Sequence, residues 1–588
     1  MPGVQAWRAM GIALVAASVA RALAQDCAPV QLAAASGGVN DAFGTSAAAG
    51  TDTIVFGSPA RKVGLNAFQG QATVFRFVGA AWTIEATLNA SDGAANDSLG
   101  SAAAISGDTI VLGAPGKTNG ANTFQGAVYV FTRSGTIWTQ QAKLLAADGS
   151  LGDSFGCSVS IFGDTLVVGA YAKASGANFN QGAAYIFTRS GSAWTQQAKL
   201  TASDAAANDF FGIGASAGLD TVVIGASSKT VTGNLAQGAA YAFTRTGSVW
   251  TQQAKLVASD GAAGDSFANS VSLSGNSVLL GAQYKHNGIN EYQGAGYVFT
   301  RSGSAWTQQA KLSASDGAAF DYLGSSCVLA GDTAILGAPN QTIAGSSAQG
   351  SAYVFSRTGS VWSQQSKLLE GNGLNDDKFG SSVALAGSVA VSTAPGRAVG
   401  NNADQGAAFV FGSNIPINII QQPSSLTTCT ANDVIFSLTA AGTGPFGYQW
   451  QWKAGTEVPS WIPVVNGVNT GGTRSFTVPN ATGPALTVRF FQQLSQGNPF
   501  ADFRCIVSNS CGSATSTIAQ VRVCWADLNC DNQVDDLDFV FFASAYNVLE
   551  CSDPGMPPRC PSDLDFSGTV DDLDFAMFAS AYDALSCP

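Results

Sequence analysis

Short runs of alternating small and large apolar residues, separated by Gly, Ser, Asn and Asp, fill most of the chain. One representative stretch contains four such runs, at residues 155–161, 165–170, 183–188 and 193–200. Alternation with a period of two residues between turn-forming residues is typical of β-strands. The second run, TLVVGA, is apolar throughout, which predicts a strand buried on both faces. The pattern therefore predicts a unit of four consecutive strands.

This four-strand unit recurs at a fixed interval. A Trp in the fourth run and a Gln-Gly pair before the third run both repeat every 56 residues: Trp82, Trp138, Trp194, Trp250, Trp306 and Trp362, and Gln69, Gln125, Gln181, Gln237, Gln293, Gln349 and Gln405. Repeats of four strands and this length are typical of β-propeller blades. We therefore predict a mainly β protein in which residues 25–412 form a seven-bladed propeller.

The ends of the array are irregular. The seventh unit has no fourth run of its own after Phe411, whereas Leu88 ends the fourth run of the first unit. One period before Leu88 lies Leu32, ahead of the first unit. We expect residues 27–32 to supply the outer strand of the last blade, because this would close the ring and remove an open sheet edge.

Recurring Phe-Gly pairs, followed by Gly-x-Pro in several units, make the array resemble FG-GAP repeats. The residues that carry the resemblance are Phe43-Gly44, Phe155-Gly156, Phe211-Gly212 and Phe379-Gly380, with Gly57-Ser-Pro59, Gly113-Ala-Pro115 and Gly337-Ala-Pro339. FG-GAP repeats build the propellers of integrin α-subunits and of many secreted bacterial proteins. Integrin-like repeats often carry a calcium loop between the first two strands, but here that hairpin supplies one carboxylate, short of the roughly six oxygen ligands of a hard cation. We expect no integrin-type calcium in the propeller.

Charged residues also recur, in two loops that should emerge on the same face of the ring. The acidic positions are Asp92 and Asp97, Asp148 and Asp153, Asp260 and Asp265, and Asp316 and Asp321; the basic positions are Arg61, Lys117, Lys173, Lys229, Lys285 and Arg397. They could form a charged ring that binds a ligand, or cap turns and pair around the rim. Repetition favours pairing, and surface pairs would each contribute only about 0–1 kcal/mol.

A catalytic site is poorly supported, because nearly all polar residues recur with the period whereas a reaction needs one unique constellation. His286 is the only histidine, so no His pair can bind zinc. Its loop also holds Glu291 and breaks the repeat symmetry, which leaves open a special role or an ordinary exposed loop. Catalysis by a pair of carboxylates, as in glycosidases, is a further open alternative. Cys157 and Cys327 lie far apart around the predicted ring and are interpreted as small buried thiols.

Residues 413–523 change to shorter alternating runs, at 434–438, 448–453, 475–478, 486–490, 503–508 and 515–523. This count is typical of a β-sandwich. The segments around Trp450 and Cys505 resemble an immunoglobulin-like domain, which implies a core position for Trp450; Phe436 stands where the family's first bridging Cys would be. We prefer a Cys429–Cys511 disulfide, with Cys505 as a competing partner, and expect this module to space or support binding.

Residues 524–588 contain two copies of one acidic loop, 36 residues apart. Oxygen side chains at positions 1, 3, 5, 9 and 12, a backbone carbonyl at 7, and Asn or Gly at 6 match an EF-hand-type calcium loop. The candidate ligand positions are Asp527, Asn529, Asp531, Gln533, Asp535 and Asp538, and Asp563, Asp565, Ser567, Thr569, Asp571 and Asp574. An acidic helix-capping turn is the alternative. Each loop leads into an apolar, helix-like run, at 539–546 and 575–582.

With Asp at position 12 and no clear helix before the first loop, the pair of loops resembles a type I dockerin. That resemblance implies a calcium-dependent module that docks on a cohesin-like or cell-surface protein. The cysteines follow the same duplication: Cys524 and Cys560 lie three residues before the first ligand of their loop, and Cys551 and Cys587 lie 24 after it. We expect disulfides Cys524–Cys551 and Cys560–Cys587, which would stabilise a small core.

Composition and the N-terminus indicate the compartment. Only 11% of the 588 residues are charged and the net charge is -12, which argues against a nucleic-acid partner. Residues 1–24 combine Arg8, an apolar run at 9–20 and a small-residue Ala-Leu-Ala end, the pattern of a signal peptide. The apolar run is shorter than the ~20 residues of a spanning helix, and no later stretch reaches that length. We expect secretion or cell-surface localisation without a membrane span, an oxidising destination in which cysteines can pair.

Together these patterns predict a secreted, non-enzymatic protein. The propeller face would bind a protein or glycan ligand, the middle module would act as a spacer, and the calcium-binding tail would attach the protein to its partner. The alternative is an extracellular polysaccharide-degrading enzyme, a glycoside hydrolase or lyase, anchored through the dockerin-like tail.

Overall fold

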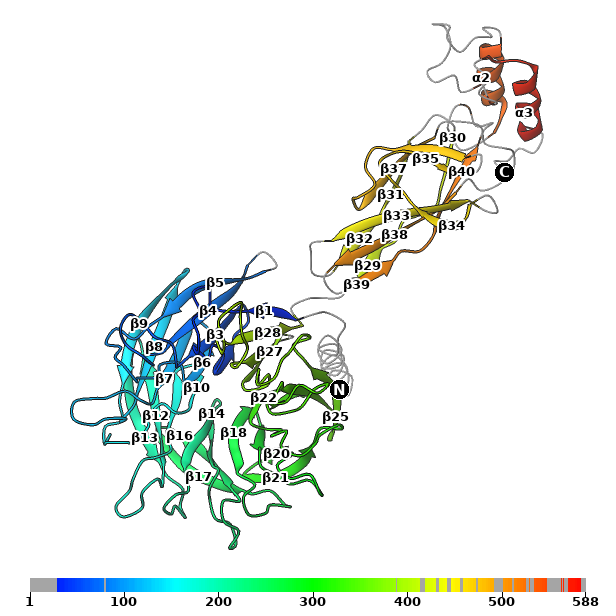
Figure 1. Cartoon of the computed structure of the whole chain (residues 1–588). Helices are drawn as coiled ribbons and strands as arrows, with labels where there is room; N and C mark the ends of the chain where they lie inside the picture. The colour runs from blue at the N-terminus through cyan, green and yellow to red at the C-terminus, as the bar shows by residue number, and fades with distance from the viewer. Residues whose placement is uncertain are drawn as a thin grey trace. The chain divides into compact units, whose positions relative to one another are not determined.

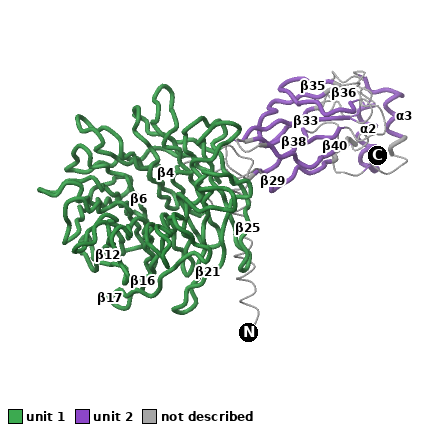
Figure 2. Tube along the Cα trace, turned by 60° about the horizontal axis from the view of Figure 1, so that its bottom comes forward, with its two compact units in different colours: residues 1–413 green, residues 414–588 purple. Residues whose placement is uncertain are grey.

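The computed structural model describes residues 29–78, 81–387, 389–412, 418–429, 433–441, 446–454, 458–471, 474–490, 501–509, 512–524, 528, 534–546, 562, 564 and 569–582. The predicted signal peptide lies outside these residues. The chain divides into two compact units, residues 1–413 and 414–588, which are coloured separately in Figure 2.

Four-stranded antiparallel sheets, arranged around a common centre, make up the first unit (Figure 1). Among the described residues there are seven, numbered here as blades 1 to 7. Blades 1 to 3 are β2 (Ser46–Ala49), β3 (Thr53–Ser58), β4 (Gln71–Val78) and β5 (Ala81–Leu88); β6 (Ala102–Ser106), β7 (Thr109–Ala114), β8 (Ala127–Ser134) and β9 (Ile137–Leu144); and β10 (Val159–Phe162), β11 (Thr165–Ala170), β12 (Ala183–Ser190) and β13 (Ala193–Leu200).

The remaining blades follow the same order of strands. Blades 4 and 5 are β14 (Phe211–Ala217), β15 (Thr221–Ala226), β16 (Ala239–Thr246) and β17 (Val249–Leu256); and β18 (Phe267–Ser274), β19 (Ser277–Ala282), β20 (Ala295–Ser302) and β21 (Ala305–Leu312). Blades 6 and 7 are β22 (Ser326–Ala330), β23 (Thr333–Ala338), β24 (Ser351–Thr358) and β25 (Val361–Leu368); and β26 (Val383–Ala386), β27 (Val389–Ala394), β28 (Ala407–Phe411) and β1 (Val30–Leu32). The propeller fold with four-stranded blades is the fold that the sequence predicted.

The second strand of each blade lies between its neighbours, as its apolar sequence predicted. Every residue of β11 is buried, and the core around it combines side chains of blades 2 and 3. A glycine near the end of this strand allows adjacent blades to approach closely: a Cβ added at Gly169 would lie 1.9 Å from the carbonyl oxygen of Gly212. The Gly in the TLVVGA pattern is therefore required by backbone-to-backbone packing between blades.

The ring closes as the position of Leu32 predicted. Strand β1 pairs antiparallel with β28, with Val30 opposite Val410 and Leu32 opposite Ala408. The side chains of Leu32, Phe43 and Val410 share one core with residues of blade 1. A strand from the start of the propeller thus completes the last blade, which confirms that prediction.

The first strand is shorter than predicted in blade 3, whereas in blades 4 and 5 it begins at the equivalent Phe211 and Phe267. In blade 3, β10 begins at Val159 rather than at residue 155. Phe155 is fully buried, but Gly156 has a φ of 93°, which an L side chain rarely adopts, so the Phe-Gly pair forms a turn ahead of the strand. The Phe-Gly pair of blade 3 therefore marks the entry to its first strand.

Two larger sheets and one two-stranded sheet make up the described part of residues 418–524. The strands are β29 (Asn418–Gln421), β30 (Leu426–Cys429), β31 (Val434–Ser437), β32 (Thr439–Ala441), β33 (Gly447–Ala454), β34 (Val458–Pro463), β35 (Gly467–Gly471), β36 (Arg474–Val478), β37 (Ala485–Phe490), β38 (Ala501–Asn509), β39 (Gly512–Thr515) and β40 (Ala519–Cys524). The larger sheets follow the orders β30-β40-β38-β33-β34, with β39 beside β38, and β31-β37-β36-β35.

Both sheets contribute to one apolar core, in which Trp450 is fully buried as predicted. Its indole Nε1 donates to the carbonyl oxygen of Gly483 at 3.0 Å. The predicted runs missed β29, β30, β32, β34 and β35, and the run 515–523 extended across the break between β39 and β40. A break separates the latter two after the Ser516 amide bonds the Cys505 carbonyl, because the Cys505 amide donates to the Ser516 hydroxyl at 2.9 Å in place of a backbone carbonyl.

Two helices occur in the described part of the tail, α2 (Asp536–Tyr546) and α3 (Asp572–Tyr582). They begin three residues before the predicted runs, because Asp535 and Asp571 act as N-caps. The Asp535 carboxylate accepts a hydrogen bond from the Leu537 amide at 2.9 Å, and Asp571 does the same for Leu573. Among the described helices none has the length and apolar character needed to cross a membrane.

Candidate functional site

The recurring basic and acidic residues meet in pairs on one face of the ring. Lys117, for example, lies 2.8 Å from Asp97, and its ammonium also donates to a backbone carbonyl of the same loop. The equivalent pairs are Lys173–Asp153, Lys229–Asp209 and Lys285–Asp265, each at 2.9 Å, Arg397–Asp377 at 2.6 Å, and Arg61–Asp41. The pairing prediction is confirmed.

These pairs are not surface pairs, which corrects the sequence interpretation. Lys117 is 5% exposed and Asp97 2%. A buried pair differs from a surface pair because removal of one partner leaves an uncompensated charge away from water. The sequence could not show this, because burial depends on the two loops folding over each other.

A second carboxylate per blade joins the same network. In the loop between blades 1 and 2, Asp92 accepts hydrogen bonds from Tyr129 at 2.6 Å and from Lys143 at 2.8 Å. Burial alone would raise the pKa of Asp92, but these hydrogen bonds and the charge of Lys117 lower it to about 2. Burial and the hydrogen bond to Asp92 raise the pKa of Tyr129. The corresponding networks recur in the next blades through Tyr185, Tyr241, Tyr297 and Tyr353.

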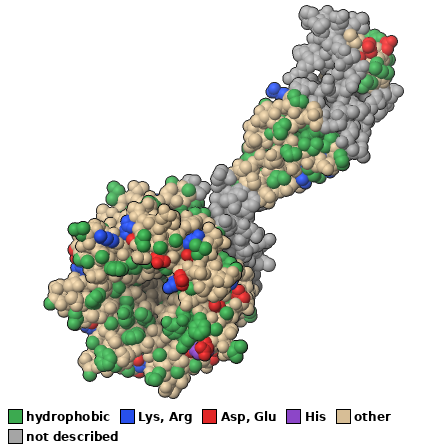
Figure 3. Space-filling model, viewed as in Figure 1, with side chains coloured by type: hydrophobic (Ala, Val, Ile, Leu, Met, Phe, Trp, Pro, Cys, Tyr) green, Lys and Arg blue, Asp and Glu red, His purple; other side chains and the backbone are tan. Residues whose placement is uncertain are grey.

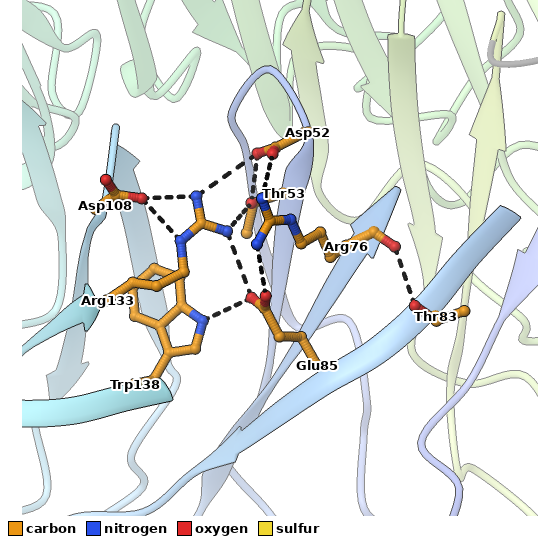
Figure 4. A network of polar contacts seen from close by, with 8 residues as sticks. All are labelled: Asp52, Thr53, Arg76, Thr83, Glu85, Asp108, Arg133 and Trp138. Atoms are coloured by element: carbon orange, nitrogen blue, oxygen red, sulfur yellow. Dashed lines mark hydrogen bonds and ion pairs between the residues drawn. The ribbon is translucent and has the colours of Figure 1, made fainter. Parts of the chain in front are cut away.

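The opposite face carries an arginine clamp between blades, which the sequence interpretation missed (Figure 4). Arg133 of blade 2 bonds Asp108 in its own hairpin and reaches Thr53 of blade 1 at 3.1 Å. The guanidinium lies 5.3 Å from the ring centroid of Trp138, whose Nε1 donates to Glu85 of blade 1 at 2.8 Å. The Asp of the Gly-Asp turn therefore binds arginine.

The clamp recurs between later blades, with a Gln carbonyl in place of Glu85. The tryptophan-to-glutamine pairs are Trp194–Gln141, Trp250–Gln197, Trp306–Gln253 and Trp362–Gln309. Its signal in the sequence is an arginine five residues before each of these tryptophans. Where blades 7 and 1 meet, Trp82 Nε1 is buried without a partner among the described residues.

The loop between blades 6 and 7 departs from the pattern at a buried acid. Glu370 stands where the six equivalent positions have Ala, is 4% exposed, and neither carboxyl oxygen has a hydrogen-bond partner within the described structure. Burial, followed by the negative charge of Asp377, raises the pKa of Glu370 to about 8, against the attraction of Arg397. The surroundings of Glu370 therefore favour its protonated form.

Blade 6 lacks the basic residue altogether. Gln341 replaces it and donates to Asp321 at 3.1 Å, while its carbonyl accepts hydrogen bonds from Ser351 and Tyr353. Burial raises the pKa of Asp321, whose hydrogen bond from Gln341 comes from a neutral amide in place of an ammonium. An amide can thus occupy the lysine position.

Blade 5 contains an aromatic cluster made by Tyr284, His286, Tyr292, Phe320 and Tyr322. Ring centroids lie 5.5 Å apart for Tyr284–Tyr292, 4.8 Å for His286–Tyr292 and 5.6 Å for Tyr292–Phe320. His286 and Phe320 are exposed, and the three tyrosines are half-buried. The symmetry break that the sequence located at His286 therefore belongs to a larger set of unique side chains.

The two candidate calcium loops are described only in part. Asp527, Asn529, Asp531, Gln533, Asp563, Asp565 and Ser567 lie outside the described residues. The position-12 residues, Asp538 and Asp574, are fully buried. Asp538 accepts the amides of Leu528 at 2.7 Å and Asp535 at 2.9 Å, and Asp574 holds the second loop in the same way.

In both loops, a carboxylate therefore joins the start of the loop to its end through hydrogen bonds. The described residues Asp535, Thr569 and Asp571 also offer oxygen atoms, the ligand type that suits a hard cation. The complete set of predicted ligands is not tested, because the other positions are described only in part. No cluster of three potential metal-binding His, Cys, Asp or Glu side chains occurs within the described ranges. The helices that follow pack together through Phe542 and Phe578, whose rings stack at 4.9 Å.

The predicted disulfides each involve a cysteine outside the described residues: Cys511, Cys551, or both Cys560 and Cys587. Cys505 is free and buried, so it does not compete for Cys429. The backbone register of β30 and β40 places Cys429 opposite Cys524. Cys157 and Cys327 are free thiols, as predicted, but they are half-buried and not fully buried.

Comparison with known proteins supports the repeat. The model of the FG-GAP repeat matches residues 82–131, 138–187, 194–243, 250–299, 306–355 and 362–411, which together exceed half of the chain. No curated protein matches the chain.

Three solved structures show similarity at low sequence identity. They are the β-propeller domain of the Trilobed protease from Pyrococcus furiosus (10% identity, 59% of this chain and 87% of that chain, TM-score 0.34), an acylaminoacyl peptidase from Pyrococcus horikoshii (9%, 61% and 49%, 0.33), and a GH74 xyloglucanase from Xanthomonas campestris (10%, 81% and 67%, 0.34). These likenesses carry no information about what this chain binds.

Proposed function

Because the chain belongs to the FG-GAP repeat family, we propose that it is a secreted, non-catalytic binding protein built on a closed seven-bladed propeller. The propeller would present a ligand-binding face, residues 413–523 would form an immunoglobulin-like spacer, and residues 524–588 would attach the protein to a cohesin-like or cell-surface partner in the presence of calcium.

The observation that carries the proposal is that the recurring charged groups of the propeller are engaged in buried or inter-blade contacts. Lys285, for example, is 5% exposed and bonded to Asp265, and Arg133 is held by acidic groups of two blades. Such residues stabilise the ring and do not face a substrate. The features unique to one blade are then the candidates for recognition, and the aromatic cluster of blade 5 is the most exposed of them.

The proposal for the tail rests on the duplicated loops. Asp538 and Asp574 close both loops through equivalent hydrogen bonds, and each loop leads directly into a helix. A bound calcium ion would neutralise the clustered carboxylates of each loop and hold it in one conformation.

Calorimetric titration of the chelator-treated full chain with calcium tests the tail. We expect two calcium ions per chain for the wild type and one for Asp527→Ala, because that variant removes the first ligand of one loop. Asp536→Ala is the matched control, since it removes a neighbouring acid outside the proposed ligand positions and should leave two sites. Absence of calcium uptake by the wild-type chain would refute the calcium-dependent module.

A polysaccharide-degrading enzyme is the second candidate, and one observation favours it. Glu370 and Asp377 are two carboxyl groups of which one has a raised pKa, as a general acid requires. Glu370 is only 4% exposed and Asp377 2%, so substrate access is poor. Release of reducing ends from a polysaccharide by the wild type, and its loss in Glu370→Gln, would favour this alternative.

A further inference from the structure

We propose that the aromatic cluster of blade 5 binds the apolar ring face of a polysaccharide. Its side chains are Tyr284, His286, Tyr292, Phe320 and Tyr322. This inference rests on the proposed binding function and adds to it a location on the propeller and a class of ligand.

Two loops carry the cluster, and hydrogen bonds join their backbones. The equivalent loops of the other blades are joined in the same manner. The Tyr322 amide donates to the Tyr292 carbonyl at 3.1 Å, and the Phe320 amide to the Glu291 carbonyl at 2.8 Å. In blade 1 the equivalent amides of Ser98 and Asn96 bond Phe68 and Ala67 at 2.9 Å. The scaffold therefore brings these positions together generally, and their side chains decide what the surface offers.

Only blade 5 places aromatic rings at all three of the joined positions. Tyr292 corresponds to Phe68, Phe124, Asn180, Ala236, Ala348 and Asp404 of the other units. Phe320 corresponds to Asn40, Asn96, Gly152, Asn208, Gly264 and Asp376, and Tyr322 to Ala42, Ser98, Ser154, Phe210, Ser266 and Lys378. Folding of the loop accepts small and polar residues at these positions, so the blade needs none of the three aromatic rings.

The backbone conformation makes the aromatic residues costly. Tyr292, Phe320 and Tyr322 have φ values of 51°, 67° and 60°, in the left-handed region that favours Gly and Asn. Bulky residues held in this region cost about 1–3 kcal/mol each and concentrate at functional sites. The other units place Asn or Gly at the Phe320 position most often, which avoids the cost.

The chemistry of the cluster matches a sugar ring. Phe320 is 48% exposed and contacts the half-buried Tyr292, against which Tyr284 and Tyr322 pack. The tyrosines add hydroxyl groups to this set of apolar rings. His286 and Glu291 are exposed beside it, and in Figure 3 the purple atoms of the histidine lie at the surface next to green hydrophobic atoms. A pyranose has an apolar C–H face and polar hydroxyl edges. An aromatic ring with polar groups at its edge satisfies both requirements.

Retention of the full chain on insoluble cellulose, chitin, xylan, mannan and β-1,3-glucan tests the inference. We expect the wild type to be retained on at least one of the five. The variant Tyr292→Asn/Phe320→Asn/Tyr322→Ser carries residues that other blades have at these positions, and its retention should fall about tenfold or more, since central aromatic contacts dominate binding energies. Its melting temperature should stay within a few degrees of the wild-type value or rise.

The matched control is Phe124→Asn/Phe210→Ser, which makes the same kinds of change at the equivalent positions of blades 2 and 3. It should bind as the wild type does. Should the triple variant lose its fold, Phe320→Asn alone, at the most exposed ring, is expected to lower retention at an unchanged melting temperature.

Three results would overturn the inference. Lack of retention on all five polysaccharides would do so, as would a large loss of stability in Phe320→Asn, which would give the cluster a structural role. Retention unchanged in a folded triple variant would place sugar binding elsewhere, and the proposed function would then survive. Release of reducing ends by the wild type would instead refute the non-catalytic function and leave the cluster as a binding site.

Discussion

Lys285 and His286 are neighbours in the sequence of blade 5, but they differ in burial, in contacts and in how often they recur. Lys285 is buried, pairs with Asp265 at 2.9 Å, and has an equivalent in most other blades. His286 is exposed, contacts Tyr292, and has no histidine equivalent in any other unit. The contrast indicates that chemistry repeated in most blades holds the ring together, whereas chemistry found once is available for recognition.

The largest effect should come from breaking a recurring pair. Lys229→Met leaves Asp209 as a buried carboxylate without its cation, and we expect the free energy of unfolding to fall by about 3–5 kcal/mol. Denaturant unfolding followed by tryptophan fluorescence measures the change. Lys229→Gln is the matched control, because blade 6 naturally has Gln341 at this position, and it should cost less than Lys229→Met. A loss below about 1 kcal/mol for Lys229→Met would mean that the pair behaves as a surface pair.

A smaller, pH-dependent effect is expected at Glu370. Its folded-state pKa is raised from 4.5 to about 8, so the folded protein binds a proton that the unfolded chain releases. Stability therefore falls as pH rises from about 4.5 to about 8. Glu370→Gln keeps a neutral donor beside Asp377, and should raise the free energy of unfolding by about 1–3 kcal/mol at pH 8 with little change at pH 5.

Thermal unfolding of Glu370→Gln and the wild type between pH 5 and pH 8 measures this difference. Asp376→Asn, at an exposed neighbouring position, is the control and should leave the pH dependence unchanged. Equal pH dependence in the wild type and Glu370→Gln would show that the buried acid is ionised in the folded state.

The sequence predicted the parts of the structure that depend on period and on turn chemistry. The repeat of Trp and Gln-Gly gave four strands per blade, and the position of Leu32 gave the closing strand. Burial of Lys117 with Asp97 was missed, because both types of residue are common on surfaces and only the folded loops show that they are enclosed. Arg133 was missed because its contacts cross from one blade to the next.

The candidate site was predictable only in part. His286 and Glu291 were visible as breaks in the period. Tyr322 is 36 residues away from His286 in the sequence, and nothing in the pattern joins the two loops. The hydrogen bond between the Tyr322 amide and the Tyr292 carbonyl makes that connection. The calcium loops of the tail were predicted from the spacing of their candidate ligands alone, which is a local property of the sequence. The calcium sites therefore stay a prediction.

Hydrogen exchange followed by mass spectrometry, with the full chain free and bound to a soluble form of the polysaccharide that retains it, tests the central claim most directly. The account predicts slower exchange on binding in residues 283–293 and 317–323 of blade 5, and unchanged exchange in the equivalent loops of the other blades. Protection spread evenly over the equivalent loops of all blades, or protection confined to residues outside blade 5, would show that recognition does not depend on the residues unique to that blade.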